Sequence, residues 1–205
     1  MPILEDAKRV LERATGLGRP REEDVLQSTR PRTPHLFYLK DDGKTPNNPT
    51  LPLVLYRTPV RLREGLDPAA VFEELFASNG WKDSWRDGIY DFLHFHTGTH
   101  EVLGIARGKV RVQFGGTRGK TVTLKAGDVA ILPAGTGHKR LSASRDLLVV
   151  GAYPASGKYD EPQPSEVTHD KAVRAIAKVP APAKDPVYGK YGPLVRLWKI
   201  TRRAR

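Results

Sequence analysis

The chain of 205 residues contains no cysteine, and its only methionine is the first residue. The absence of cysteine excludes disulfide bonds, thiolate catalysis and metal sites with cysteine ligands. Any bound metal must therefore have nitrogen and oxygen ligands. The sequence also lacks an apolar run near the roughly 20 residues that a membrane-spanning helix needs. Residues 1–15 mix acidic and basic side chains. We therefore expect a soluble, cytoplasmic protein without a membrane segment.

The composition favours a single domain built mainly of strands. Hydrophobic residues make up 39% of the chain, while 17 prolines and 19 glycines indicate many turns between short elements. The net charge of +11 raises the question of nucleic acid. However, the basic residues are scattered, and the one basic cluster lacks interleaved aromatics to stack bases. We interpret the charge as a solvated surface. That cluster is Lys199, Arg202, Arg203 and Arg205.

The element pattern predicts helices at both ends of a strand-rich centre. Apolar residues at helical spacing predict a helix over residues 4–14, a second helix near 68–79 that Asp67 caps, and a third after Ser165. Residues 19–50 read mostly as loop, and 51–60 as a strand suited to a sheet edge. Seven further short strands follow, which is typical of a closed sandwich or barrel. They are residues 89–95, 102–106, 109–114, 121–124, 129–132, 139–141 and 147–153.

Three of the six histidines lie in the stretch HFHTGTHEV, residues 94–102. In an extended strand, His94 and His96 project to the same side, so their imidazoles approach one point. A turn at Gly98 then returns the chain, and either His100 or Glu101 would face that point. Strand alternation alone does not decide between these two neighbours. Three neutral imidazoles and a carboxylate would suit a divalent Fe, Mn, Ni, Cu or Zn ion.

Two spaced motifs place this stretch in a wider pattern. The first runs from Gly88 through His94, His96 and Glu101 to Gly108, and the second comprises Gly127, Pro133, Gly135 and His138. Together they resemble the two signature motifs of the cupin superfamily. The asparagine expected four residues after the last histidine is Ser142 here. Flanking phrases such as FASNGWKDSWRDGIY and LLVVGAYP look like those of the YjlB-like bacterial cupins.

The resemblance implies an all-β fold, a single cupin jelly roll with peripheral helices at both ends. We expect an N-terminal helical and loop extension over residues 1–34, a barrel over 35–160 with the inserted helix near 68–79, and a C-terminal helix and tail over 161–205 that pack on the barrel. It also implies one divalent transition metal bound by His94, His96, Glu101 and His138. His100, beside the glutamate, would then support a ligand or lie at the pocket rim.

Further side chains share the predicted ligand side of their strands. Tyr90 and Phe92 alternate with the histidines, and Arg140 shares the parity of His138, so these three residues are the candidate substrate contacts. Arg140 would favour a substrate carboxylate, although a solvated arginine at the rim explains its position equally well. The stretch GGTRGKT lacks the spacing of a phosphate-binding loop and predicts a hairpin turn instead.

These observations favour a metal-dependent enzyme that acts on a small organic molecule. A dioxygenase or other oxidoreductase is slightly ahead of an isomerase or lyase, because this ligand set accepts redox metals. A non-catalytic small-ligand-binding cupin is the alternative from another class. By resemblance, we also expect a homodimer.

Overall fold

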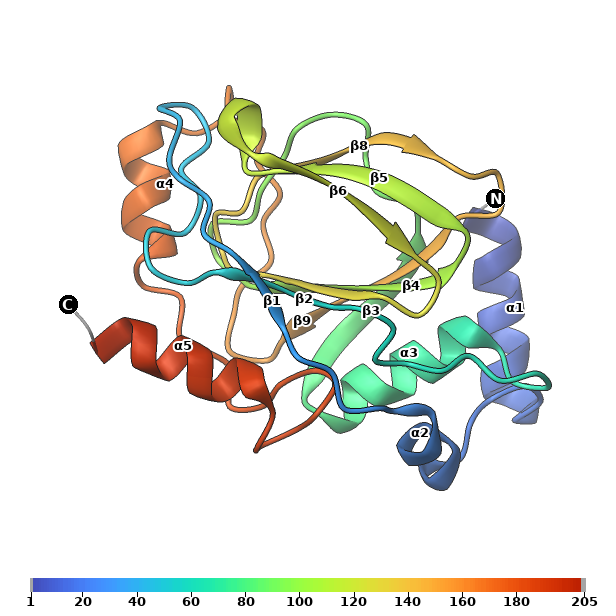
Figure 1. Cartoon of the computed structure of the whole chain (residues 1–205). Helices are drawn as coiled ribbons and strands as arrows, with labels where there is room; N and C mark the ends of the chain where they lie inside the picture. Colours follow the sequence, from blue (N-terminus) through green and yellow to red (C-terminus); the bar gives the residue numbers. More distant parts are fainter. Residues whose placement is uncertain (1, 204–205) are drawn as a thin grey trace.

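Two antiparallel sheets face each other in the computed structural model, which describes residues 2–203 and the side chains of 4–12 and 14–199. The larger sheet has the strand order β1-β2-β7-β4-β9-β3, and the smaller has the order β6-β5-β8 (Figure 1). The larger contains β1 (His35–Phe37), β2 (Leu53–Tyr56), β3 (Trp81–Asp87), β4 (Glu101–Arg107), β7 (Val129–Leu132) and β9 (Leu148–Pro154). The smaller contains β5 (Lys109–Phe114), β6 (Lys120–Lys125) and β8 (His138–Ala143).

Apolar side chains from both sheets fill the space between them. In β5, Val110, Val112 and Phe114 are buried while Lys109 and Arg111 are exposed, as the alternation predicts. They pack with Leu103 and Ile105 of β4 and with further residues of β2, β6, β7 and β9. This filled interior gives the jelly roll its core.

The outer face of the larger sheet is also buried, because helices cover it (Figure 1). Asp67 caps α3 (Pro68–Ser78) by accepting a hydrogen bond of 3.1 Å from Ala70 N, and Pro68 begins the helix. Phe72 of α3 and Trp198 of α5 (Pro193–Arg203) pack against this face. β2 and β7 are buried on both faces, and accordingly both strands consist of hydrophobic residues.

A buried ionic cluster attaches the N-terminal helix α1 (Pro2–Thr15) to the barrel. Arg86 of β3 has a fully buried side chain that lies 2.8 Å from Asp67, 2.8 Å from Glu73 and 3.0 Å from Glu12 of α1. Lys8 of α1 lies 2.7 Å from Asp67. The charges are matched locally, which makes their burial tolerable.

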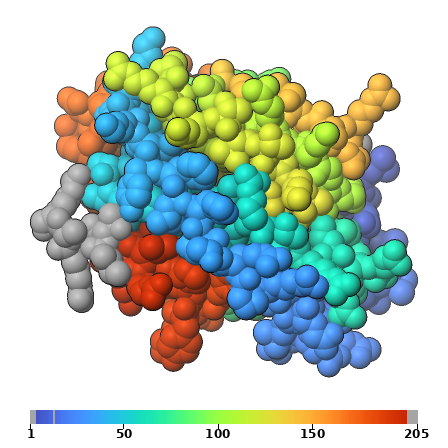
Figure 2. All heavy atoms as spheres, viewed as in Figure 1, coloured from blue at the N-terminus to red at the C-terminus, as the bar shows by residue number. Residues whose placement is uncertain are grey.

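The remaining helices are α2 (Glu22–Ser28), the 3-10 turn η1 (Gly116–Arg118) and α4 (His169–Ile176). In the space-filling view, the blue N-terminal segment crosses the molecule between the red C-terminal helix and the yellow-green hairpin of β5 and β6 (Figure 2). None of the described helices is long and apolar enough to cross a membrane. The side chains of Arg202, Arg203 and Arg205 lie outside the described part.

Some details of the expected elements were wrong. Residues 19–50 are mostly loop, as expected, but they include α2 and β1, and β1 takes the edge position expected of the strand at 51–60. Residues 81–87, for which no strand was predicted, form β3. Residues 89–95 form no ladder strand and make a single bridge, between His94 and His138. Residues 194–198, which carried no helix prediction, belong to α5. The turn at GGTRGKT does join the hairpin of β5 and β6.

Candidate metal centre

His94, His96 and His138 converge at one mouth of the sandwich. His94 and His96 lie on the connection between β3 and β4, and His138 is the first residue of β8. The bridge between His94 and His138, with N–H···O distances of 3.3 and 2.9 Å, holds the two backbones together. Each of the three residues offers a ring nitrogen, and these nitrogens lie within 4.8 Å of one another. The three histidines are thus positioned to bind a metal ion.

Backbone carbonyls orient the three rings through their Nδ1 atoms. His138 Nδ1 lies 3.1 Å from the carbonyl oxygen of Thr136, and His94 Nδ1 lies 3.3 Å from that of Phe92. His96 Nδ1 donates to the carbonyl oxygen of Asp160. An Nδ1–H bonded to a carbonyl leaves Nε2 unprotonated in the neutral ring, which is the form that binds metals.

The loop after β9 supplies the carbonyl that orients His96. The Asp160 carboxylate accepts hydrogen bonds of 2.8 Å from Thr97 N and 2.9 Å from Gly98 N, and a third from the Thr97 hydroxyl. Gly98 has no room for a side chain, since a Cβ there would lie 2.3 Å from the carbonyl oxygen of Lys158. The turn at Gly98 is therefore tied to this loop.

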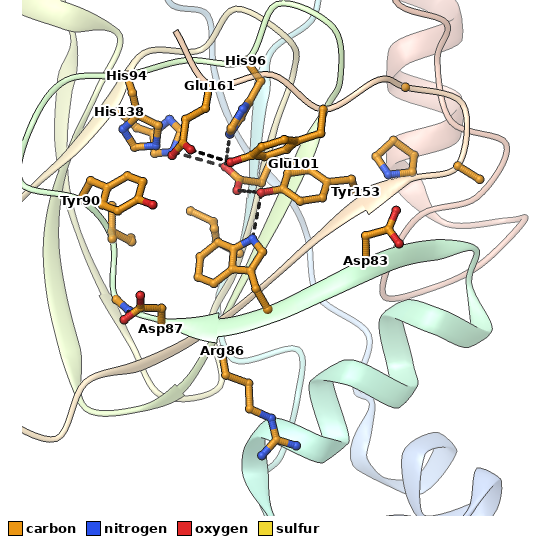
Figure 3. Close-up of a pocket in the computed structure, with 18 of the residues that line it drawn as sticks. Asp83, Arg86, Asp87, Tyr90, His94, His96, Glu101, His138, Tyr153 and Glu161 are labelled. Atoms are coloured by element: carbon orange, nitrogen blue, oxygen red, sulfur yellow. Dashed lines mark hydrogen bonds and ion pairs between the residues drawn. The ribbon is translucent and has the colours of Figure 1, made fainter. Parts of the chain in front are cut away.

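Glu101, the first residue of β4, points its carboxylate at the histidines (Figure 3). Its Oε2 lies 3.4 Å from His96 Nε2 and 3.3 Å from His138 Nε2. The hydroxyl of Tyr153 donates to Oε1 at 3.3 Å, and Trp85 Nε1 donates to the same hydroxyl at 2.9 Å. This chain of hydrogen bonds fixes the carboxylate and leaves Oε2 facing the imidazoles.

Burial and charge separate the protonation states of the cluster. Burial and the nearby His138 lower the pKa of His94 to about 3. Burial also disfavours the charged form of His96, but the Glu101 carboxylate outweighs this and raises its pKa to about 9. Glu101 itself is buried, yet His96 and His138 hold its pKa well below the usual range. At neutral pH and without a bound metal, Glu101 is therefore an anion, His94 is neutral, and His96 carries a proton that a metal ion would have to displace.

Two buried atoms at the centre of the cluster lack hydrogen bonds. His96 Nε2 and Glu101 Oε2 are both inaccessible to solvent, and neither has a hydrogen-bond partner among the described residues. Orphaned polar atoms of this kind are costly and rare in folded proteins. Nitrogen and oxygen donors that face one another across 3.4 Å fit a cation that would satisfy both of them.

The cluster opens into a cavity of about 650 Å³. Aromatic side chains from four segments line it: Trp85, Tyr90, Tyr153 and Tyr159. Trp85 lies directly over Gly151, where a Cβ would be 2.0 Å from Trp85 Cε2. The Tyr159 hydroxyl donates to Glu161 Oε2 at 2.6 Å, at the cavity wall. The volume is that of a small-molecule site.

His100 lies on the opposite face of the strand from Glu101. Its Nε2 lies 3.1 Å from the carbonyl oxygen of Pro180, and its Nδ1 accepts a hydrogen bond of 2.9 Å from Ala134 N. Its ring packs against Trp198, with centroids 4.7 Å apart. The supporting role expected for His100 does not match these contacts, because successive strand residues face opposite sides and its side is covered by α5.

Of the three predicted substrate contacts, only Tyr90 lines the cavity. Phe92 stacks on Tyr90 at 4.7 Å and is 40% exposed, so it contacts the wall from outside. Arg140 is oriented away, with Nη2 3.5 Å from Asp91 Oδ2. The structure places neither Phe92 nor Arg140 in the cavity wall, so the basis for a substrate carboxylate at Arg140 is lost.

Sequence reasoning missed several residues that shape the site. No site role was predicted for Trp85, Tyr153, Tyr159, Asp160 or Glu161. Tyr153 had a usable signal, because it ends the apolar run of β9, where a polar hydroxyl would need a partner. Asp160 and Glu161 lie in a loop whose path local spacing does not predict.

The fold and this histidine cluster define a cupin, and comparison with known proteins confirms it. Residues 88–149 match the family model described as a cupin domain. More particularly, the chain belongs with the YjlB-like cupins. It is 37% identical over 167 residues to protein YjlB of Bacillus subtilis strain 168, an alignment that covers 82% of this chain and 98% of that relative. The predicted family and fold class are thereby confirmed.

Similarity to solved structures is more distant. A mutant oxalate decarboxylase of Bacillus subtilis aligns with 56% of this chain and 28% of its own, at 19% identity and a TM-score of 0.34. This chain therefore spans less than a third of that enzyme. An acireductone dioxygenase from Bacillus anthracis, with a cadmium ion in its active centre, aligns with 48% of this chain and 71% of its own, at 19% identity and a TM-score of 0.33.

Proposed function

We propose that this cupin is a metal-dependent enzyme of the dioxygenase or oxidoreductase type that acts on a small organic molecule. His94, His96, His138 and Glu101 would hold one divalent transition metal. One observation carries the proposal: His96 Nε2 and Glu101 Oε2 are buried, form no hydrogen bond, and face each other across 3.4 Å in the wall of a cavity. A closed structural metal site would not open into 650 Å³ of space.

A metal bound by these residues would supply Lewis-acid or redox chemistry at positions that the protein leaves open. The chain's own residues set the conditions for it. The hydrogen-bonded pair Trp85 and Tyr153 holds Glu101 in place, and the aromatic wall limits access of water to a bound substrate. The Tyr159 hydroxyl holds a proton between its oxygen and Glu161 Oε2, at the cavity surface.

The Tyr159–Glu161 pair also favours the second candidate, a metal-assisted isomerase or lyase. Such reactions need a group that gives or takes a proton beside the substrate. Consumption of dioxygen separates the two candidates, because an isomerase or lyase turns over equally well under anaerobic conditions.

The homodimer stays a prediction, which sedimentation velocity at micromolar concentration tests.

Metal analysis of the purified protein tests the proposed site. We expect about one transition-metal ion per chain, and a loss of most of it in His96→Ala and Glu101→Gln, since each removes a ligand. His169→Ala is the matched control, because His169 lies outside the cluster and pairs with Asp41 at 2.7 Å. Full metal content in the two site variants would contradict the ligand assignment.

Oxygen uptake with small-molecule panels tests the reaction type in the same samples. Metal-loaded parent protein should consume dioxygen with at least one small oxygenated substrate, while His96→Ala should not. Turnover that persists without oxygen would favour the isomerase or lyase. Tight binding of a small molecule without any turnover would favour a non-catalytic binding cupin.

A further inference from the structure

Acidic side chains surround the mouth of the cavity, although the whole protein carries a net charge of +11. Asp83 and Asp87 are the third and the last residue of β3, Glu161 comes from the loop after β9, and Asp6 comes from α1. A random patch on so basic a protein would carry positive charge. The local excess of carboxylates therefore creates a negative potential at the entrance.

The two arginines among the described lining residues do not neutralise these acids. The Arg86 side chain points away from the cavity, below β3, into the buried ionic cluster that contains Asp67 and Glu73 (Figure 3). Arg9 Nε lies 2.8 Å from Glu73 Oε1, and its Nη2 donates to Ser84 O at 2.8 Å. Both guanidinium groups are thus engaged on the helix side of β3.

Three of the carboxylates at the mouth have no cationic partner. Among the described side chains, no ion pair includes Asp83, Asp87 or Glu161. Glu161 accepts a hydrogen bond from the Tyr159 hydroxyl, and Asp87 accepts one of 2.8 Å from Gly88 N. Both donors are neutral groups, so neither hydrogen bond is an ion pair.

The backbone of β3 is distorted at Asp83. The pairing register with β9 shifts between Lys82 and Trp85, and Asp83 adopts a φ of 52° within this irregularity. A positive φ is uncommon outside glycine, and β-bulges often redirect a side chain next to a binding site. The distortion places the Asp83 carboxylate on the cavity side, near Tyr153 (Figure 3).

Aromatic rings line the same cavity as the acids and the histidines. Tyr90, Tyr153 and Tyr159 line the cavity, and the rings of Tyr153 and Tyr159 meet edge to face with centroids 5.0 Å apart. Aromatic faces attract cations, and carboxylates add a net charge of the right sign. In the wall of the same cavity, the buried Nε2 of His96 and Oε2 of Glu101, which form no hydrogen bond, independently indicate a site built for a ligand.

From these features we infer that the cavity selects a small organic molecule with a substituted ammonium group. The ammonium lies among the acids and tyrosines at the mouth, and an oxygen function of the same molecule extends toward the histidines. This inference rests on the proposed function for placing the substrate in this cavity. It replaces the substrate carboxylate that Arg140 suggested from sequence.

The test compares two probes that differ only in charge. Choline and 3,3-dimethylbutan-1-ol have the same shape and the same hydroxyl, but one carries a quaternary nitrogen where the other has carbon. We expect calorimetry on the metal-loaded protein to show choline binding about tenfold more tightly. The advantage should shrink as salt rises, since the mouth is open to solvent.

Neutral variants then locate the source of the preference. Asp83→Asn, Asp87→Asn and Glu161→Gln should each weaken choline binding by about three- to tenfold and leave the alcohol unchanged. Asp170→Asn is the control, because Asp170 is an exposed acid on α4 outside the cavity lining. Circular dichroism establishes that each variant is folded.

Three results would each overturn the inference. They are equal binding of the two probes, absence of choline binding, and a choline preference that survives when Asp83→Asn, Asp87→Asn and Glu161→Gln are combined in one chain. Metal content measured in the same samples separates the two proposals. A choline preference in a chain that binds no metal would refute the proposed function and support the ammonium site. Full metal occupancy without a preference for choline would support the proposed metal site and refute the ammonium site.

Discussion

Replacing Asp160 by alanine should loosen the metal centre without touching a metal ligand. The Asp160 carboxylate accepts three hydrogen bonds from Thr97 and Gly98, and its own carbonyl orients the His96 ring. Alanine removes the three side-chain bonds and keeps the carbonyl. The loop then loses its attachment to the turn that carries His96, and the carbonyl no longer has a fixed position.

The size of the effect follows from these bonds. Hydrogen bonds to a charged acceptor contribute about 1.5–3 kcal/mol each, but Asp160 is half-buried and water replaces part of the loss. We therefore expect the free energy of unfolding to fall by about 2 kcal/mol. Disturbing the partner of a ligating histidine typically weakens metal binding by about 10- to 100-fold. We expect the same range for Asp160→Ala.

Competition with a coloured chelator measures zinc affinity, and urea unfolding of the metal-free proteins measures stability. Asp160→Asn serves as a graded variant, because its amide oxygen still accepts from the backbone N–H groups of Thr97 and Gly98. Asp170→Ala is a control for the loss of an exposed acid. We expect zinc affinity in the order parent, Asp160→Asn, Asp160→Ala. If Asp160→Ala loses stability but binds zinc within about threefold of the parent, the loop does not position His96 and the argument fails.

Three further predictions concern other parts of the chain. Arg86→Met leaves buried carboxylates without their shared cation. Urea unfolding at neutral pH should therefore show that the free energy of unfolding falls by about 3–5 kcal/mol. A fall of less than about 1 kcal/mol would contradict the role of the buried cluster. Burial raises the pKa of Asp42, but hydrogen bonds from Thr45, Thr117 and Lys44 outweigh it and lower the pKa to about 2. Because the pKa is lower in the folded protein, the ionised Asp42 carboxylate stabilises the fold above about pH 4, and this contribution is lost as pH falls toward 2. Asp42→Asn should therefore lower the free energy of unfolding by about 1–2 kcal/mol near pH 6 and by far less near pH 2.5. A cost that is independent of pH would refute that reading. His100→Phe should destabilise the fold by about 2–4 kcal/mol, because Pro180 O and Ala134 N–H lose their partner, and should leave metal content unchanged; a matching loss of metal would show that His100 acts on the site.

The sequence predicted the histidine cluster well because side chains alternate between the two faces of an extended chain, with a period of two residues. His94 and His96 face one point, as alternation requires, while Phe95 is buried on the other side against Ala134 and Ile176. Alternation also separates His100 from Glu101, but only the covered outer face of the sheet shows which of them turns inward. That cover comes from α5, distant in sequence.

The predictions that failed did so because contacts with residues distant in sequence determine the structure at those positions. β3 escaped prediction because the irregularity at Asp83 breaks its alternation. Residues 89–95 look like a strand, yet they lie on the connection between β3 and β4 of the larger sheet and make only the bridge between His94 and His138 to β8 of the smaller sheet. Arg140 has the parity of His138, but Asp91 holds it outside the cavity. Each case depends on a partner remote in sequence.

His138 begins a strand of the smaller sheet, whereas Glu101 begins a strand of the larger one. A cation shared by these two residues would join the two layers at the end of the sandwich where the histidines converge. Free metal at about 100 times its dissociation constant would add about 2.7 kcal/mol to the resistance of the fold against unfolding. Metal supply in the cell would thereby govern how long each molecule survives, in addition to whether it can react.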